Sequence, residues 1–178
     1  MDVTMIPTKL QGTIVPPPSK SQAHRLIIAA ALSDGESVIS NIAFSQDIQA
    51  TLDAMVQLGA QWQQSDDGCI RIKGLQNGRP ILGEDGLPHL NCGESGSTLR
   101  FLIPLALAVA GGGVFTGRGR LMERPQKPYF DLFEEHGIAY TLDHGVLTVR
   151  GKLEQGTYAL PGNVSSQFFT GLLYGLTL

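Results

Sequence analysis

Small and hydroxyl-bearing residues dominate positions 91–98, directly before a long apolar run that carries Arg100. This pattern predicts a helix start, where unpaired backbone N–H groups lie at the positive end of the helix dipole. Gly93 and Gly96 would let an anion approach that backbone closely. Three hydroxyls can donate further hydrogen bonds, those of Ser95, Ser97 and Thr98. The stretch therefore predicts an anion-binding site, although a simple helix N-cap with a tight turn has the same pattern.

Two other stretches have the same form. Residues 18–25 and residues 163–167 each place small and polar side chains before an apolar run. With starts taken at Ser19, Glu94 and Ser165, successive starts lie 75 and 71 residues apart. A nearly constant period indicates one supersecondary unit that is repeated. Three such helix starts at equivalent positions could converge on one polyanionic ligand.

Two groups of cations accompany these helix starts. Lys20 and Arg25 belong to the first predicted helix, which is apolar nearly all round and is therefore expected to be buried. A cation in the first turn opposes the helix dipole, so Lys20 calls for a compensating anion. The loop at residues 117–127 carries four more cations, among them Arg120 and Arg124. Arginine can fork onto a phosphate or carboxylate, but a solvated loop is the simpler alternative.

Composition limits the class of protein. With 178 residues, the chain is long enough for one or two domains with a sizeable core. A net charge of −3 lacks the basic excess that is typical of nucleic-acid-binding proteins. Cys69 and Cys92 are not spaced as a metal site or a disulfide framework, which favours a reducing compartment. Without a secretory leader or an apolar run of membrane length, we expect a cytoplasmic protein. No motif indicates a metal or a cofactor, so we expect neither.

The apolar periodicity and the turn residues predict a recurring order of elements: helix, strand, helix, strand, strand. The first unit is expected at residues 18–32, 37–42, 47–58, 61–64 and 69–73. After a short strand at 89–91, the second is expected at 94–110, 113–116, 128–136, 138–142 and 146–149. A third unit begins at residues 158–160 and the helix after Ser165, and is truncated at position 178.

Four motifs, taken together, resemble the 5-enolpyruvylshikimate-3-phosphate synthase family. They are Pro-Ser-Lys-Ser-x-x-x-Arg at 18–25, Gly-x-x-Gly-Ser-Thr-Leu-Arg at 93–100, Arg-Leu-Met-Glu-Arg-Pro at 120–125 and Ser-Ser-Gln-Phe at 165–168. They occur in the family's order and extend across most of the chain. Each motif alone is common, whereas the four in this order are specific.

The resemblance implies an α/β (α+β) protein built from repeated βαβαββ units, in an inside-out α/β barrel domain of the enolpyruvyl-transferase type. It implies two such domains, with helix N-termini facing the cleft between them. Residues 16–178 would be an incomplete N-terminal domain with a truncated third unit. Residues 1–15, which alternate loosely as one or two short strands before three prolines, would pack with the absent C-terminal domain.

The resemblance also implies a reaction: transfer of the enolpyruvyl group of phosphoenolpyruvate to the 5-hydroxyl of shikimate 3-phosphate, by addition and then elimination of phosphate. The family's general acid and base carboxylates belong to the later part of the chain. This chain alone would therefore position two anions but is expected to be inactive. The expected partners are these two small molecules, with no nucleic acid and no membrane, and the full-length protein is expected to be a monomer.

Site residues follow from the motifs by position. Lys20 would touch both substrates and Gln167 would lie between them, and these two are the candidate catalytic residues. The other residues expected to bind shikimate 3-phosphate are Ser21, Arg25, Ser165 and Ser166. Phosphoenolpyruvate would contact Gly96, where glyphosate competes, and Arg124. Arg100 and Arg120 would support the site.

The sequence differs from the family motif at some positions, and two other functions are compatible with it. Glu94 and Ser95 replace the more familiar Asn-Ala pair, and Phe101 replaces a proline, which leaves the response to inhibitors open. One alternative is the UDP-N-acetylglucosamine enolpyruvyl transferase of the same fold, but the loop at 117–127 lacks the reactive cysteine of that enzyme. A second is a non-catalytic phosphate-binding or RNA-end-processing module, and the acidic composition argues against RNA as its ligand.

Overall fold

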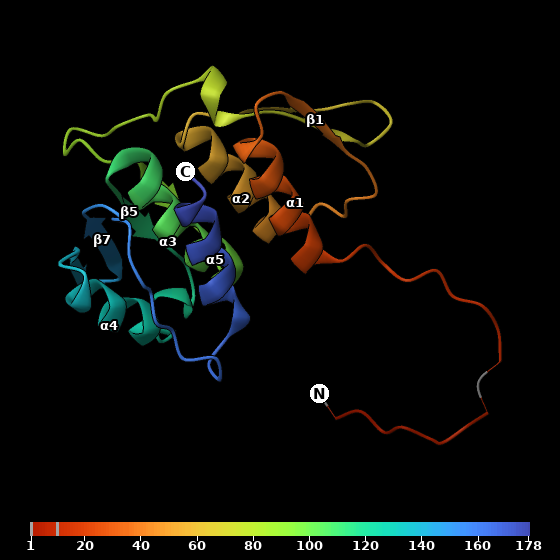
Figure 1. Cartoon of the computed structure of the whole chain (residues 1–178). Helices are drawn as coiled ribbons and strands as arrows, with labels where there is room; N and C mark the ends of the chain where they lie inside the picture. Colours follow the sequence, from red (N-terminus) through yellow and green to blue (C-terminus); the bar gives the residue numbers. More distant parts are fainter. Residues whose placement is uncertain (1, 10) are drawn as a thin grey trace.

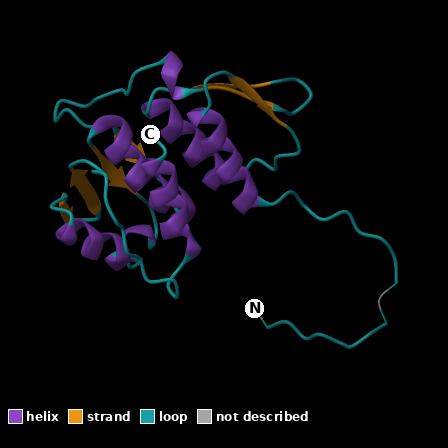
Figure 2. Ribbon diagram, viewed as in Figure 1, coloured by secondary structure: helices purple, strands orange, loops and turns teal. Residues whose placement is uncertain are grey.

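A computed structural model describes residues 2–9 and 11–178 (Figure 1, Figure 2). The first unit consists of α1 (Lys20–Leu32), β1 (Glu36–Ile39), α2 (Gln46–Gln57), β2 (Gln61–Gln64) and β3 (Ile70–Lys73). The second consists of β4 (His89–Asn91), α3 (Gly96–Ala110), β5 (Gly112–Thr116), α4 (Lys127–Glu135), β6 (Ala139–Asp143) and β7 (Val146–Arg150). A last helix, α5 (Ser166–Leu176), follows, and short 3₁₀ turns lie at Leu75–Asn77 and Leu121–Glu123.

The predicted repeat is confirmed, because the order helix, strand, helix, strand, strand occurs twice and α5 starts a third round. Each of α1, α3 and α5 begins after a serine whose side chain accepts a hydrogen bond from a backbone N–H of the first turn. The second of these N-caps is Ser95 rather than the predicted Glu94. The Ser95 Oγ accepts from the Thr98 N–H at 3.2 Å, which satisfies one of the free donors of α3.

Two sheets carry the helices. The first has the order β1-β3-β2 and is antiparallel, and the second has the order β4-β5-β7-β6 with only β4 and β5 parallel. The β6–β7 hairpin turns at His144 and Gly145, which both have positive φ, as a two-residue type I′ turn requires. Along β7, Leu147 and Val149 are buried while their neighbours are more exposed, so this strand packs one face on the core.

Helix α3 forms the centre of the core. Its side chains from Leu99 to Leu107 are almost all buried, and it lies between the four-stranded sheet and α5 (Figure 1). Pro104 interrupts its hydrogen bonding, because proline has no N–H to donate to the carbonyl of Arg100. The Tyr129 hydroxyl of α4 lies 2.8 Å from that carbonyl oxygen and 2.9 Å from the Phe168 oxygen of α5. One buried tyrosine thus joins three helices where the proline frees an acceptor.

Helix α5 approaches α3 closely along two glycines. A Cβ added at Gly171 would overlap the freed Arg100 oxygen and lie 2.5 Å from the Tyr129 hydroxyl. A Cβ at Gly175 would lie 2.8 Å from the Pro104 oxygen. The two glycines are one helical turn apart, so they form a flat strip on which the α3 backbone rests. This packing sets the distance between the starts of the two helices.

Other sequence predictions also differ from the structure. The described residues among the first 15 form no strand and run along an exposed path away from the body (Figure 1). Residues 1 and 10 lie outside the described residues, and the proposed packing of this segment on a further domain stays a prediction. Helix α1 is not buried all round, because Leu26 is 43% exposed. Among the described helices, none is long and apolar enough to cross a membrane.

Candidate anion-binding site

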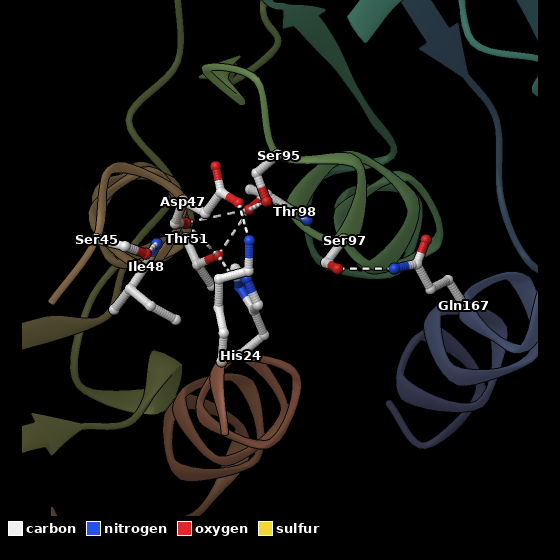
Figure 3. Close-up of polar contacts among 10 residues, drawn as sticks. His24, Ser45, Asp47, Ile48, Thr51, Ser95, Ser97, Thr98 and Gln167 are labelled. Atoms are coloured by element: carbon white, nitrogen blue, oxygen red, sulfur yellow. Dashed lines mark hydrogen bonds and ion pairs between the residues drawn. The ribbon is translucent and has the colours of Figure 1, made fainter. Parts of the chain in front are cut away.

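The starts of α3 and α5 are joined by one amide side chain. Gln167 Oε1 accepts a hydrogen bond from Arg100 Nη1 at 2.8 Å. Gln167 Nε2 donates to Ser97 Oγ at 2.7 Å (Figure 3). The Arg100 guanidinium also lies over the Phe168 ring at 4.7 Å from its centroid. Two motifs that are far apart in the sequence therefore meet, as the repeat predicted.

Arg124 completes this end of the site. Its Nη1 lies 2.9 Å from the point that a Cβ of Gly96 would occupy, so the guanidinium rests against the first residue of α3. The pKa of Arg100 is lowered by burial first and then by the charge of Arg124. In the part of the chain that the structure describes, neither arginine forms an ion pair with a carboxylate. Two neighbouring cations at a helix N-terminus favour an anion between them.

At the start of α1, the compensating anion is supplied by the protein. Lys20 Nζ lies 2.6 Å from Asp47 Oδ2 of α2, although the lysine side chain is still 57% exposed. The sequence argument asked for an anion beside Lys20 but did not foresee a protein carboxylate. Solvent screening makes this exposed pair a weak contributor to stability, so Lys20 remains available to a ligand.

Arg25 connects α1 to α5. Its guanidinium donates to Ser21 O at 2.8 Å and to Thr170 Oγ1 at 3.5 Å, and it lies 5.1 Å from the centre of the Phe101 ring. Thr170 in turn donates to the Ser166 carbonyl. The predicted residues of α1 therefore adjoin those of α5, where Ser165 Oγ accepts from the Gln167 N–H at 3.3 Å.

Arg120 is the predicted residue that the structure separates from the others. Its Nε pairs with Glu123 Oε2 at 3.1 Å and its side chain is 88% exposed. The described contacts of Arg120 include none with the starts of α1, α3 or α5, so the predicted bracing role has no structural support. Within the described part of the chain, Arg120 shares a pocket of about 260 Å³ with Glu123, Arg124 and Pro125.

A groove with a volume of about 490 Å³ lies elsewhere, between α2 and β4. It is lined by Gln46, Gln49, Ala50, Asp53, Ala54, Gln57, His89, Asn91, Gly93 and Arg118. Of these, only Gly93 was expected near an anion, and none was expected to bind a substrate. The candidate site is instead an open polar face where helix starts meet.

Sequence reasoning missed the buried contacts that His24 and Thr51 make behind this face. His24 Nδ1 is 2.7 Å from Thr51 Oγ1, which is 2.7 Å from Thr98 Oγ1 (Figure 3). Asp47 and Thr51 stand one helical turn apart on α2, as Lys20 and His24 do on α1. This matched i, i+4 spacing was the available signal, because it places two pairs on facing helix surfaces.

The buried histidine predicts a pH dependence of stability. Burial lowers the pKa of His24 from 6.5 to about 4, with Lys20 and Arg25 acting in the same direction and Asp47 opposing. The unfolded chain therefore binds a proton near pH 6.5 that the folded chain binds only near pH 4. The free energy of unfolding should fall between pH 6.5 and 4, by up to about 3 kcal/mol from this group, and no further below pH 4.

Urea unfolding of the chain and of His24→Asn between pH 4.5 and 7.5 measures this effect. The carboxylates titrate in both proteins, so the difference between the two curves isolates His24. The difference should shrink as the pH falls. Parallel curves would show that the histidine is not held neutral by the fold.

Repeated α/β units whose serine-capped helices gather two arginines and a lysine define an α/β domain of the enolpyruvyl-transferase fold. The sequence model of EPSP synthase (3-phosphoshikimate 1-carboxyvinyltransferase) matches residues 4–176. The chain belongs to this family.

Relatives and solved structures agree. A 3-phosphoshikimate 1-carboxyvinyltransferase of Clostridium perfringens is 47% identical over 178 residues, covering 99% of this chain and 41% of that protein. The enzyme of that name from Clostridioides difficile is 44% identical, covering 94% of this chain and 40% of its own length. An EPSP synthase structure from Acinetobacter baumannii superposes with a TM-score of 0.74 at 25% identity, over 92% of this chain and 37% of that one. The chain thus spans less than half the length of the relatives that it matches.

Proposed function

We propose that the chain supplies the N-terminal half of the substrate site in an enzyme that transfers the enolpyruvyl group of phosphoenolpyruvate to the 5-hydroxyl of shikimate 3-phosphate and releases phosphate. The observation that carries this proposal is the meeting of three motifs: Arg124 rests on Gly96, and Gln167 bridges Arg100 and Ser97. The names of the relatives support the same reaction.

The two substrates have separate places in this proposal. Phosphoenolpyruvate lies at the start of α3, with its phosphate on Arg124 and its body against Gly96, where glyphosate would compete. Shikimate 3-phosphate lies across the starts of α1 and α5, with Ser165 and Ser166 on its phosphate. Arg25 already connects those two helices through Thr170.

Lys20 and Gln167 lie between the two substrates in this arrangement. Asp47 holds the Lys20 ammonium group at the N-terminus of α1. Arg100 and Ser97 fix the orientation of the Gln167 side chain. These groups bind and orient two anions in reacting geometry, which lowers the entropic part of the barrier. They also stabilise charge that develops during addition and elimination. We assign the proton transfers to carboxylates outside this chain, and we propose a monomeric, cytoplasmic full-length enzyme.

An amide NMR titration of the 178-residue chain tests the proposal, with shikimate 3-phosphate, phosphoenolpyruvate and UDP-N-acetylglucosamine as ligands. Shikimate 3-phosphate should shift amides of Lys20, Ser21, Arg25 and residues 165–167, and phosphoenolpyruvate should shift Gly96 and Arg124. UDP-N-acetylglucosamine should shift neither set. Stronger shifts with the nucleotide sugar, or shikimate 3-phosphate shifts only in the groove between α2 and β4, would overturn the assignment.

A further inference from the structure

Four buried polar side chains form one continuous chain of hydrogen bonds. They come from three helices and from the N-cap of α3: His24, Thr51, Thr98 and Ser95. Each of the four is at most 2% exposed, and each of the three contacts between them measures 2.7 Å (Figure 3). Buried polar groups that are fully bonded specify one arrangement of their elements.

This chain of hydrogen bonds leads from α1 to the start of α3. Lys20 and His24, one turn apart on α1, face Asp47 and Thr51, one turn apart on α2. Lys20 and Asp47 form the exposed ion pair, and His24 and Thr51 form the buried contact. Thr51 in turn contacts Thr98, and Thr98 contacts the Oγ of Ser95, next to Gly96.

The shortest contacts favour one direction of proton donation along these four side chains. The hydroxyls of Thr51 and Thr98 can also donate to the Asp47 carbonyl oxygen, but those contacts are longer, at 3.2 and 3.5 Å. If His24 carried its proton on Nε2, that buried N–H would have no partner, because Nε2 is buried without a hydrogen bond. An unpaired buried N–H is costly and rare. With the proton on Nδ1, the histidine donates to Thr51, Thr51 donates to Thr98, and Thr98 donates to Ser95. Burial keeps the ring neutral, with its pKa lowered to about 4, so the second nitrogen carries no proton.

This direction leaves one hydroxyl proton free, and it belongs to Ser95. The Ser95 oxygen accepts from both the N–H and the hydroxyl of Thr98, so its two lone pairs are occupied. Its O–H then has no acceptor among the described residues. The group sits at the N-terminus of α3 beside Gly96, against which the Arg124 guanidinium lies.

We propose that His24 is a positioning residue for the anion site: through Thr51 and Thr98 it orients the Ser95 hydroxyl as a donor to the ligand bound at the start of α3. This inference deepens the proposed function and rests on it, because the ligand in question is phosphoenolpyruvate. In this proposal the Ser95 hydroxyl meets the ligand at the start of α3 although the residue is only 2% exposed, and His24 acts only through the hydroxyls of Thr51 and Thr98.

The tautomer of His24 tests the direction of the chain without any ligand. Long-range ¹H–¹⁵N correlation spectra of the histidine rings, recorded between pH 5.5 and 7.5, distinguish a protonated Nδ1 from a protonated Nε2. We expect His24 to be neutral with the proton on Nδ1. A proton on Nε2 would reverse every donor in the chain and would overturn the inference, whatever the protein binds.

Binding of phosphoenolpyruvate tests the effect on the site, with His24→Asn, His24→Leu and Thr51→Val compared with the unchanged chain. Asparagine can donate from a position close to that of Nδ1, so His24→Asn should keep its dissociation constant within about twofold. His24→Leu and Thr51→Val interrupt the chain and should weaken binding by about threefold to tenfold, the range of one hydrogen bond. The matched control is His136→Asn, which changes a histidine that stacks on Tyr158 outside the chain.

The amide spectrum and the unfolding free energy of each variant separate loss of fold from loss of the donor. Rescue by asparagine but not by leucine, at similar stability, supports the inference, since a purely structural role would track stability. Equal binding by all variants would overturn it. If the unchanged chain binds no phosphoenolpyruvate, the proposed function fails and the role of Ser95 fails with it, whereas a proton on Nε2 beside normal binding rejects the inference alone.

Discussion

Arg124→Ala is expected to weaken phosphoenolpyruvate binding by about tenfold to a hundredfold, the range for removing a hydrogen bond between charged groups. The reason is its place: the guanidinium rests on Gly96 and, among the described residues, has no carboxylate partner, so an anion is its natural counter-charge. Arg124→Lys should recover only part of the loss, because lysine keeps the charge but not the planar fork. Isothermal titration calorimetry or amide NMR measures the dissociation constants.

The matched control is Arg71→Ala, which removes the same charge from β3. Arg71 pairs with Glu36 on the exposed surface of the first sheet, so its removal should change binding by less than twofold. Gly96→Ala tests the same contact from the other side, because its Cβ would displace the Arg124 guanidinium. Equal losses for Arg124→Ala and Arg71→Ala would mean that net charge, and not this site, attracts the ligand.

Gly171→Ala is expected to destabilise the chain by about 2–3 kcal/mol, because overpacked cores lose about this much. The added Cβ would meet the Arg100 oxygen and the Tyr129 hydroxyl, which Pro104 has brought together. Alanine's higher helix propensity recovers about 1 kcal/mol at most, so the loss should persist. Separation of α3 and α5 should also disturb the bridge from Gln167 to Ser97. Urea unfolding measures the first effect and amide shifts at the helix starts measure the second.

Gly162→Ala is the control for this change. Its added Cβ would meet open space and its backbone does not have the left-handed conformation, so stability should stay the same or rise by about 0.4–1 kcal/mol. If both alanine variants unfold at the same urea concentration, α5 does not rest on α3 through Gly171.

Local sequence patterns predicted the secondary-structure elements and the candidate positions for an anion. Serine caps, apolar periods and turn glycines act within a few residues, so α1, α3, α5 and both hairpins were predictable within a few positions. The same local signals marked Gly96, Arg100, Arg124 and Gln167 as candidates. Their meeting followed from the repeat, since equivalent helices of repeated units begin on the same side.

Only the tertiary structure decided which charges are already paired. Asp47 is an ordinary first-turn residue of α2 in the sequence, yet the packing of α2 on α1 places its carboxylate on Lys20. Arg120 and Arg124 belong to one motif, but the 3₁₀ turn between them directs one into solvent and the other to Gly96. Such pairings depend on contacts between residues far apart in the chain, which no local pattern records.

The buried chain of hydrogen bonds from His24 to Ser95 also could not be predicted from local sequence. His24, Thr51 and Thr98 belong to three separate helices, and only the crossing of α1, α2 and α3 places Thr51 Oγ1 2.7 Å from both His24 Nδ1 and Thr98 Oγ1. Burial then keeps the histidine neutral and limits the direction in which protons can be donated. Local sequence determined where the helices begin, and long-range packing decided how their polar groups are arranged behind the site.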